Sequence, residues 1–278
     1  MITIFCIPKP FAGSVATIQY NAIKSWTKLP GCDVILFGDE IGVGDVAREL
    51  GVRHVAQLRV NQHGTPLVSD AFARAGKMSS NRLLGYANAD IILTAKFATA
   101  ATTVAGTSLQ PFLMVGRRTD LDVSEPLDFE SDWERALEHR VRESGSLHGM
   151  AGLDYFLFPR DIPIKLPDFA VGRPGWDSWL IYQARKTGIP VIDATEAVLA
   201  IHQNHPPAYK SYGPESEENT LLAGGYLCMS TLRDADWRLC GRNGHLEVRR
   251  RLLGQIMFLA PVRGLLALKR YMVRRWSN

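Results

Sequence analysis

The sequence predicts an α/β fold in which helices flank a mixed, mostly parallel sheet. Apolar runs rich in β-branched residues alternate with helical patterns through the first half of the chain, which is typical of βαβ units. A length of 278 residues with 46% apolar residues is enough to bury a sizeable core. The chain ends in a basic stretch, so we expect a globular domain over residues 1–245 and a basic, amphipathic helical tail over 246–278.

The elements of the first half follow from these patterns in chain order. β-Branched apolar runs predict strands, and apolar residues at helical spacing predict helices. We expect strands at 2–7, 33–37, 53–55 and 111–115, and helices at about 16–29, 45–50 and 67–75. Residues 83–93 form a further apolar segment, interrupted by polar residues.

The second half has shorter elements separated by clusters of Gly, Pro and Trp. These clusters lie in residues 149–159 and 172–179, and a loop extends from about 202 to 219. Long loops in a compact domain usually bind a ligand or move. We therefore expect functional residues in these loops.

Several classes of protein are disfavoured by composition. The four cysteines include no Cys-x-x-Cys pair, so neither a zinc site nor a disulfide scaffold is indicated. The N-terminus lacks the basic region of a signal peptide. The longest apolar stretch near the end falls short of the roughly 20 residues that span a bilayer. We expect a cytoplasmic protein with reduced thiols and no transmembrane helix.

The polar pair Asn88 and Asp90 interrupts the apolar segment 83–93. If that segment is one strand, its period of two places both side chains on one side. A carboxylate there can hold Mg²⁺ or Mn²⁺ through oxygen, and the ion can bridge the phosphates of a nucleotide diphosphate. The alternative is that residues 88–90 form a turn between two short strands.

In these residues and their context the chain resembles the GT-A (Rossmann-like) glycosyltransferases, whose Asp-x-Asp motif follows the first βαβαβ half. The resemblance covers roughly residues 1–210 as an order of elements. It implies that the chain binds a nucleotide-diphospho-sugar and a divalent metal, with Asp90 as a metal ligand. Asn88 departs from the family pattern at the first acidic position, which affects the expected metal dependence more than the fold.

The loops after the first two predicted strands should border the nucleotide site, since ligands bind outside the carboxyl ends of parallel strands. Pro8 and Lys9 follow the first strand, and Asp39 follows the second. The resemblance implies that Asp39 faces the base, although a Gly-Asp turn has no need of a function. Thr65 precedes a helix and suits contact with a ribose or phosphate; alternatively it is the N-cap, with Pro66 at the first helical position.

Two acids of the second half are predicted to be catalytic. Asp154 lies between a glycine turn and an apolar strand, where it can accept hydrogen bonds from sugar hydroxyls. Asp177 lies at the predicted start of a helix, and the resemblance implies that it takes the proton of the acceptor hydroxyl. Trp176 can stack on a sugar or base. The alternatives are a turn cap for Asp154, an N-cap for Asp177 and a core position for the tryptophan.

Two histidines, His202 and His205, follow the apolar segment 191–201. The resemblance implies that a histidine here binds the metal or the diphosphate, and His202 matches best, with His205 next as a substrate contact. The alternatives are structural histidines or a separate transition-metal site. Arg117 follows the strand 111–115 and can reach acidic groups of donor or acceptor, or it lies on a solvated face.

The C-terminal stretch carries an unusual charge. Residues 248–278 contain eight bases and no acid, which leaves 24 bases and 28 acids in the rest of the chain. From Val262 onward the apolar residues follow helical spacing, with bases along another side. Such a helix can lie on an anionic membrane surface, so we expect a peripheral location on the inner face of the cell membrane. The alternative is a helix that packs on the body.

The sequence therefore predicts a glycosyltransferase that moves a sugar from a nucleotide-diphosphate donor to a carbohydrate or lipid-linked acceptor. Such an enzyme would act in cell-surface polysaccharide or glycolipid synthesis and would use Mn²⁺ or Mg²⁺. A sugar nucleotidyltransferase and an inactive, nucleotide-sugar-binding scaffold of the same fold are the alternatives. Nucleic-acid binding is disfavoured because the bases cluster on the tail.

Overall fold

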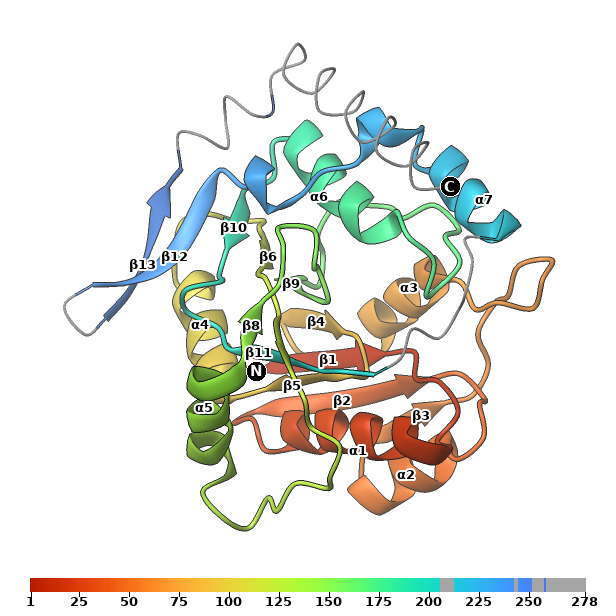
Figure 1. The fold of residues 1–278 in the computed structure, drawn as a ribbon. Helices are drawn as coiled ribbons and strands as arrows, with labels where there is room; N and C mark the ends of the chain where they lie inside the picture. The colour runs from red at the N-terminus through yellow and green to blue at the C-terminus, as the bar shows by residue number, and fades with distance from the viewer. Residues whose placement is uncertain (206–212, 243–244, 252–257, 259–278) are drawn as a thin grey trace.

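The computed structural model describes residues 1–205, 213–242, 245–251 and 258. A nine-stranded sheet forms its centre, and helices cover both faces (Figure 1). The strands of this sheet are β1 (Ile2–Cys6), β2 (Cys32–Phe37), β3 (Arg53–Val55), β4 (Leu83–Ala87), β6 (Leu113–Val115), β9 (Tyr155–Pro159), β10 (Val191–Asp193), β12 (Trp237–Arg242) and β13 (His245–Arg250). Their spatial order is β13-β12-β10-β6-β9-β4-β1-β2-β3.

Most neighbouring strands of this sheet are parallel. β4, β1, β2 and β3 form one parallel group, and β6, β10 and β12 form another. β9 joins the two groups by antiparallel pairing with β4 and β6, and β13 closes the edge antiparallel to β12. All five residues of β1 are buried, as expected for a strand with helices on both faces.

Seven helices surround the sheet in the described part of the chain. They are α1 (Gly13–Thr27), α2 (Val43–Leu50), α3 (Val68–Met78), α4 (Ala95–Ala105), α5 (Trp133–Ser144), α6 (Trp176–Lys186) and α7 (Pro214–Leu222). Short 3₁₀ turns follow at Tyr226–Cys228 and Leu232–Asp234. Apolar residues of α1, α2 and α4 share one core cluster, and those of α3 and α6 share the cluster on the other face. Alternate residues of β1 supply both clusters, Ile4 to the first and Phe5 to the second.

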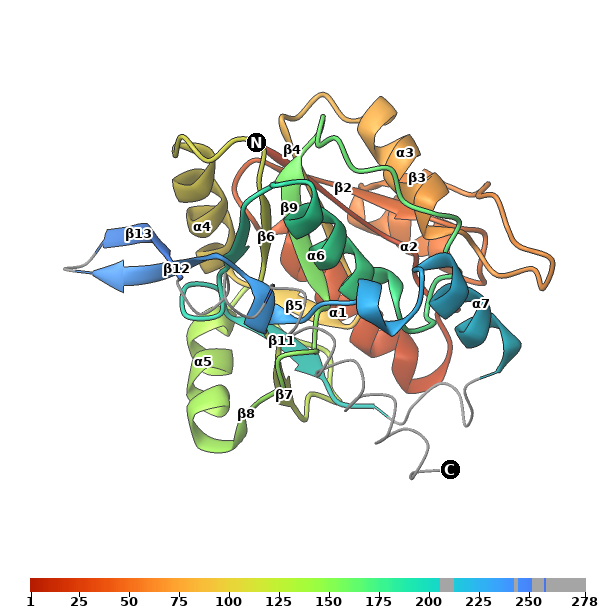
Figure 2. The same cartoon turned by 90° about the horizontal axis from the view of Figure 1, so that it is seen from above.

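A second sheet lies beside the first and carries much of the polar chemistry. Its strands are β5 (Ile91–Leu93), β7 (Thr119–Leu121), β8 (Ser146–Leu147) and β11 (Ala200–Gln203), in the order β5-β11-β7-β8. Figure 2 shows this sheet with α5 alongside. A small apolar cluster that includes Ile92, Trp133 and Ile201 joins them. This sheet brings together segments that are more than 100 residues apart in the sequence.

The predicted fold class is confirmed, but the segment 83–93 is not one strand. β4 and β5 belong to different sheets, and residues 88–90 form a turn closed by a hydrogen bond of 3.0 Å from Ile91 N to Asn88 O. The period-of-two argument for Asn88 and Asp90 was therefore wrong, because it requires a continuous extended chain. The turn alternative is correct, and the turn moves the chain from one sheet to the other.

Two helix starts also differ from the sequence-based alternatives. α3 begins at Val68 with Leu67 as its N-cap, so Thr65 is not the cap. Pro66 instead forms an isolated β-bridge with Val60, which keeps this stretch extended. α6 has Gly175 as its N-cap, with φ of 118°, so Asp177 lies inside the first turn. A positive φ favours glycine, which explains the glycine before the helix.

The predicted helical tail begins with a strand. Residues 246–250 belong to β13 and pair with β12 from Trp237 to Gly241, so the helical prediction is wrong for these five residues. Alternation along β13 allows this pairing, whereas the helical spacing was drawn from residue 262 onward. The remainder of the predicted tail, apart from Arg251 and Phe258, lies outside the described residues. Within the described chain, none of the helices has the length and apolar character needed to cross a bilayer.

Candidate active site

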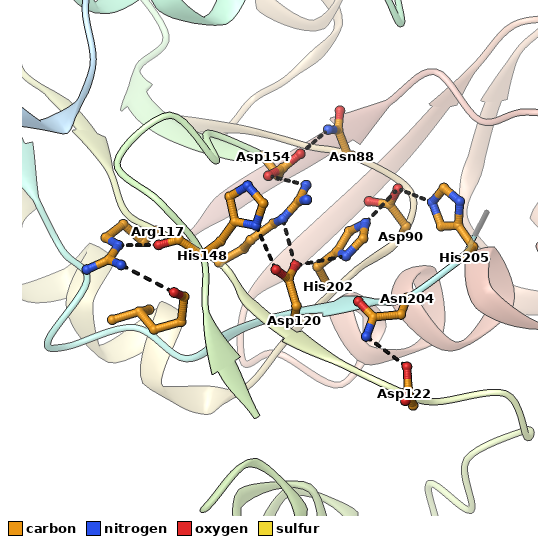
Figure 3. Close-up of polar contacts among 12 residues, drawn as sticks. Asn88, Asp90, Arg117, Asp120, Asp122, His148, Asp154, His202, Asn204 and His205 are labelled. Atoms are coloured by element: carbon orange, nitrogen blue, oxygen red, sulfur yellow. Dashed lines mark hydrogen bonds and ion pairs between the residues drawn. The ribbon is translucent and has the colours of Figure 1, made fainter. Parts of the chain in front are cut away.

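Polar side chains gather at the edge of the main sheet where its parallel strands end. Lys9 follows β1, and the turn with Asn88 and Asp90 follows β4. Asp154 directly precedes β9, which runs antiparallel and so begins at the same edge. The neighbouring second sheet adds Asp120 from β7 and His202 from β11 (Figure 3). The chain thus places its charged residues where open α/β sheets bind ligands.

The centre of this group is formed by Asp90, His202 and His205. Asp90 Oδ2 lies 3.2 Å from His205 Nε2 and 3.8 Å from His202 Nε2. One ligand atom from each residue lies within 4.8 Å of the others. Asp90 Oδ1 is buried and has no hydrogen-bond partner among the described residues. A carboxylate oxygen and two imidazole nitrogens around an unsatisfied buried oxygen fit a divalent cation.

The main chain around Asp90 is held rigidly by buried contacts. Trp26 is fully buried, and its Nε1 donates to Ile91 O at 2.9 Å. Gln203 donates to Asp90 O through its backbone N at 3.2 Å and through its side-chain Nε2 at 3.3 Å. Gln203 lies between the two histidines on the chain, so its contacts fix the spacing of all three ligand groups.

The electrostatics of the triad favour metal binding. Burial alone would raise the pKa of Asp90, but the hydrogen bond from His205 and the charges of His202 and Lys9 outweigh it and lower this pKa. Burial, helped by the charge of Arg118, lowers the pKa of His202 despite the nearby carboxylates. Asp90 is therefore ionised and His202 neutral at pH 7, which are the protonation states of metal ligands.

A second network connects this triad to Asp154. Arg118 donates to Asp154 Oδ2 at 3.0 Å and to Asp120 Oδ1 at 2.9 Å. Asn88 donates to Asp154 Oδ1 at 2.7 Å and accepts from Tyr86 at 3.2 Å. Asn88 thus uses both ends of its amide to hold Asp154. Both carboxylate oxygens of Asp154 have partners, and burial, with the charge of Asp90, raises its pKa despite Arg118.

The predicted donor-site residues lie around this centre with different environments. Lys9 is exposed, yet close enough for its charge to lower the pKa of Asp90, and its main chain is fixed by two hydrogen bonds with Gln19. Pro8 is buried and Asp39 is exposed on the loop after β2. Thr65 contacts Glu215 of α7, whose pKa it helps to lower, so its hydroxyl is engaged by the protein.

The predicted acceptor-side residues at the start of α6 are less open than expected. Trp176 is 5% exposed and packs edge-on against Tyr86 and Phe72, which favours the core alternative. Asp177 Oδ1 accepts a hydrogen bond of 2.7 Å from the N–H of Ser178. Burial, with a smaller contribution from the charge of Asp154, raises the pKa of Asp177 to about 6.

Sequence reasoning missed two residues of the site, Asp120 and His148. Asp120 Oδ2 lies 2.6 Å from His148 Nδ1, and Asp120 Oδ1 lies 3.2 Å from His202 Nδ1, although that second contact lacks hydrogen-bond alignment. Arg117 does not reach the triad; it donates to the carbonyl oxygens of His148 and Leu147 at 2.6 and 3.3 Å. An acid between two buried residues of a strand, as in 119–121, is the signal that identifies Asp120.

A cavity of about 740 Å³ lies at the opposite edge of the sheet, lined in part by Met1, Arg82 and Pro111. These residues precede or begin β1, β4 and β6, so the cavity is at the amino ends of the parallel strands. It shares no residue with the triad or the Asp154 network. The metal-ligand candidates and the Asp154 network therefore lie at the carboxyl edge of the sheet and not at this cavity.

No protein-family model and no curated protein sequence matches the chain. Similarity to solved structures is clear. The structure of S. aureus TarS residues 1–349 in complex with UDP-GlcNAc matches with a TM-score of 0.50 and 12% identity, over 82% of this chain and 67% of that one. Glucosyl-3-phosphoglycerate synthase from Mycobacterium tuberculosis, in complex with Mn²⁺, UDP and phosphoglyceric acid, matches with a TM-score of 0.50 and 17% identity, over 92% of this chain and 91% of that one.

The chain has the GT-A fold. Its identity to both structures is below 20%, so the likeness concerns the fold, and the roles of individual residues have to be argued from this chain's own geometry. Asp90 of this GT-A fold stands at the carboxyl end of β4 next to two histidines. Asn88 at the first position of the motif is a structural partner of Asp154.

Proposed function

We propose that this GT-A protein is a glycosyltransferase that uses a nucleotide-diphospho-sugar as donor. The observation that carries the proposal is the triad of Asp90, His202 and His205 at the carboxyl edge of the sheet, where one buried carboxylate oxygen has no partner among the described residues. A pyrophosphate needs positive charge at such an edge, and a divalent cation held by this triad would supply it.

The metal is proposed to be Mn²⁺ or Mg²⁺, held by Asp90 and His202 with His205 as the third contact. When bound, it would neutralise the charge that develops on the departing diphosphate. Carboxylate oxygen suits both ions, whereas two imidazoles shift the preference away from Mg²⁺. The same donor set also occurs around iron, so the fold, and not the ligand set alone, supports manganese.

The chain's own residues would bind the two substrates on either side of the triad. Lys9 contributes a positive charge toward the diphosphate, and Pro8, Asp39 and Thr65 are proposed to border the nucleoside. Asn88 would act here through its hold on Asp154. On the acceptor side, the proposed contacts are Asp154 and Asp177, whereas Trp176 packs in the core, Arg117 is bonded to the main chain of residues 147 and 148, and His205 belongs to the metal triad. Asp177, with its pKa near 6, is suited to take a proton at neutral pH.

The acceptor is proposed to be a carbohydrate or a lipid-linked sugar in cell-surface polysaccharide or glycolipid synthesis. The five bases beyond Arg251 support this choice, because they would draw the protein to the anionic inner face of a membrane. A cytoplasmic, peripheral location is part of the same proposal.

Donor hydrolysis tests the proposal, since a glycosyltransferase can pass the sugar to water when no acceptor is present. We expect the full chain to hydrolyse at least one member of a panel of UDP-, GDP- and TDP-sugars when Mn²⁺ is present, and to lose this activity in excess EDTA. Asp90→Asn should lower the rate about 100-fold or more, because the ion supplies several kcal/mol of stabilisation. Asp45→Asn, at an exposed acid on α2, is the control and should retain the rate.

Three results would contradict the proposal in different ways. If the full chain binds a sugar nucleotide but hydrolyses none, the inactive, nucleotide-sugar-binding scaffold becomes the better interpretation. If Asp90→Asn keeps full metal-dependent turnover, the metal site is elsewhere. If the full chain instead forms a sugar nucleotide from a nucleoside triphosphate and a sugar phosphate, it is a nucleotidyltransferase.

A further inference from the structure

His148 is a half-exposed residue that the surrounding structure holds at four separate points, two on its main chain and two on its ring. Its N–H donates to Arg118 O at 3.0 Å, and its carbonyl oxygen accepts from Arg117 Nε at 2.6 Å. Its Nδ1 lies 2.6 Å from Asp120 Oδ2. Its ring lies against Gly152, where an added Cβ would meet His148 Cδ2 at 2.5 Å.

This arrangement is costly for an exposed residue. Its side chain is 40% exposed, so the conformational entropy lost on ordering it is not offset by the burial of apolar surface. The contacts also occupy other side chains. The guanidinium of Arg117, for example, donates to the main chain of residues 147 and 148. Rigid support of a side chain that faces solvent is typical of a preorganised binding group.

The contact with Asp120 determines what the free nitrogen of His148 can do. Within a neutral imidazole, a carboxylate at Nδ1 favours the tautomer that carries its proton on Nδ1. Nε2 is then a hydrogen-bond acceptor, and it has no partner among the residues that the structure describes. The carboxylate would also stabilise the imidazolium that forms if Nε2 takes up a proton.

His148 also lies close to the metal triad. The two oxygens of Asp120 face two histidines, His148 through Oδ2 and His202 through Oδ1 (Figure 3). One carboxylate therefore separates a metal-ligand candidate from an accessible imidazole. His148 is the most exposed member of this group, since the side chains of Asp90, Asp120, Arg118, Asp154, His202 and His205 are 11–22% exposed.

We propose that His148 is a catalytic residue whose Nε2 receives the proton of the incoming hydroxyl group, and that Asp120 is its positioning residue. This inference rests on the proposed glycosyltransferase function. In the step, the hydroxyl oxygen forms a bond to the anomeric carbon, the bond from that carbon to the diphosphate oxygen breaks, and the diphosphate leaves with the electron pair. The hydroxyl proton passes to Nε2, and no oxidant or reductant is needed.

His148 would then take the role that the family resemblance implied for Asp177. The two candidate bases differ in how far their accepting atoms are already occupied. One carboxylate oxygen of Asp177 accepts a hydrogen bond from the first turn of its own helix. Nε2 of His148 lies on the far side of the ring from Nδ1, which contacts Asp120, the one side-chain hydrogen-bond partner of His148 within the described residues. The assignments are alternatives within one function, so an experiment can separate them without altering the proposed reaction.

The test measures hydrolysis of the donor that the full chain turns over, with water as the incoming hydroxyl. His148→Gln should lower kcat about 100-fold or more, the usual contribution of general-base catalysis, with little change in the KM of the donor. His139→Gln is the matched control, because His139 is an exposed histidine that also faces a carboxylate, Glu143, on α5. It should retain the kcat of the full chain.

Two further variants test positioning. Asp120→Asn should lower kcat at least tenfold and shift the ring ¹⁵N signals of His148 away from the Nδ1-protonated tautomer, a change that a merely structural residue would not cause. Gly152→Ala pushes on the ring of His148 and should lower kcat, whereas Gly149→Ala meets no atom within 4 Å and should not. Mn²⁺ binding by His148→Gln should match that of the full chain.

The possible results distinguish failure of the His148 role from failure of the proposed glycosyltransferase function. If the full chain hydrolyses no sugar nucleotide, the proposed function fails. If it does, and His148→Gln stays within threefold of it, His148 is not the proton acceptor and the role returns to Asp177. A ring tautomer of His148 that is unchanged in Asp120→Asn would overturn the positioning role of Asp120.

Discussion

At the scale of single residues, Asp177 couples the candidate site to stability. The side chain is partly buried in the first turn of α6, near Asp154, and its pKa is raised from 3.8 to about 6. Between these two pH values the folded state binds a proton that the unfolded state releases. Asp177 therefore stabilises the fold most below pH 3.8, and its contribution is lost as the pH rises through 6.

We predict that Asp177→Asn makes the protein more stable at neutral pH. A shift of about two pKa units corresponds to roughly 2 to 3 kcal/mol of unfolding free energy above pH 6, where the aspartate must be charged in a poorly solvated place. The gain should vanish near pH 4. Urea unfolding of both proteins at pH 4, 5.5 and 7.5 measures it, and Asp161→Asn, at an exposed position, should show no such pH dependence.

A gain that is equal at pH 4 and pH 7.5 would show that the charge of Asp177 is not the cause. In that case the pKa of this carboxyl group is close to its ordinary value, and the group loses its main qualification as a base at neutral pH.

Single residues also show how far the sequence predicts the site. Asp90 was predicted from a polar position inside an apolar segment, and His202 and His205 from the family resemblance; the structure brings these three residues together. Asp120 and His148 were missed because their meaning depends on the pairing of β7 with β8 and β11, which no local pattern reveals. Trp176 was predicted as a ligand contact but is buried, because a tryptophan next to an acid has the same sequence pattern whether its ring is buried or exposed.

At the scale of elements, the hairpin of β12 and β13 is fastened to the body by Arg251. Its side chain donates to Asp193 Oδ2 at 3.1 Å and to Leu232 O at 2.8 Å, and its N–H donates to Asp236 O at 2.7 Å. Asp193 also accepts from Thr195, whose hydroxyl oxygen accepts from Arg117 N. This chain of contacts links the C-terminal end of the described sheet to the segment that supports His148.

We predict that Arg251→Gln lowers the unfolding free energy by about 1.5 to 3 kcal/mol, because it removes hydrogen bonds made by a charged group and leaves Asp193 without its cation. Arg238→Gln on β12 is the control. The pair of Arg238 with Glu196 is exposed on both sides and 3.8 Å long, so its loss should change stability by less than about 0.5 kcal/mol. Denaturant unfolding at pH 7 compares the two, and equal effects would show that Arg251 is not an anchor.

The elements also explain which parts of the fold were predictable. Strands such as β1 and β2 were placed within a residue because buried β-branched runs have few other interpretations. The turn at residues 88–90 was placed inside a strand because its flanks are as apolar as a strand interior, although they belong to different sheets. β13 was included in the predicted helical tail because the domain boundary was drawn where the basic stretch begins, whereas the helical spacing itself starts only at Val262.

At the scale of the whole molecule, the site exists because two sheets meet. β4 ends in the main sheet and β5 begins in the second, so Asp90 stands at their junction with the histidines of β11 and the loop that follows it. The order β4-β1-β2 then directs the loops after β1 and β2 to the same edge. The alternation of strands and helices in the sequence predicts a ligand-binding edge at the carboxyl ends of the parallel strands. Which residues lie at that edge depends on the strand order, which the sequence pattern does not reveal.

The proposed membrane contact of the tail is tested on the whole molecule. We predict that the full chain co-sediments with vesicles that contain phosphatidylserine and not with phosphatidylcholine alone. Replacement by Gln of the five last bases, Arg263, Lys269, Arg270, Arg274 and Arg275, should weaken binding at least 100-fold, since each base near the surface contributes about 1 kcal/mol.

The control makes the same change in charge on exposed positions of the body, with Gln at Arg48, Arg53, Lys77, Lys96 and Arg135. If attraction depended only on the net charge of +4, both variants would lose binding equally. If it depends on a basic cluster next to apolar residues, only the tail variant does, because screening limits each charge to about 10 Å at 0.1 M salt and scattered bases cannot act together. Equal binding by the full chain and the tail variant would contradict the membrane role of the tail.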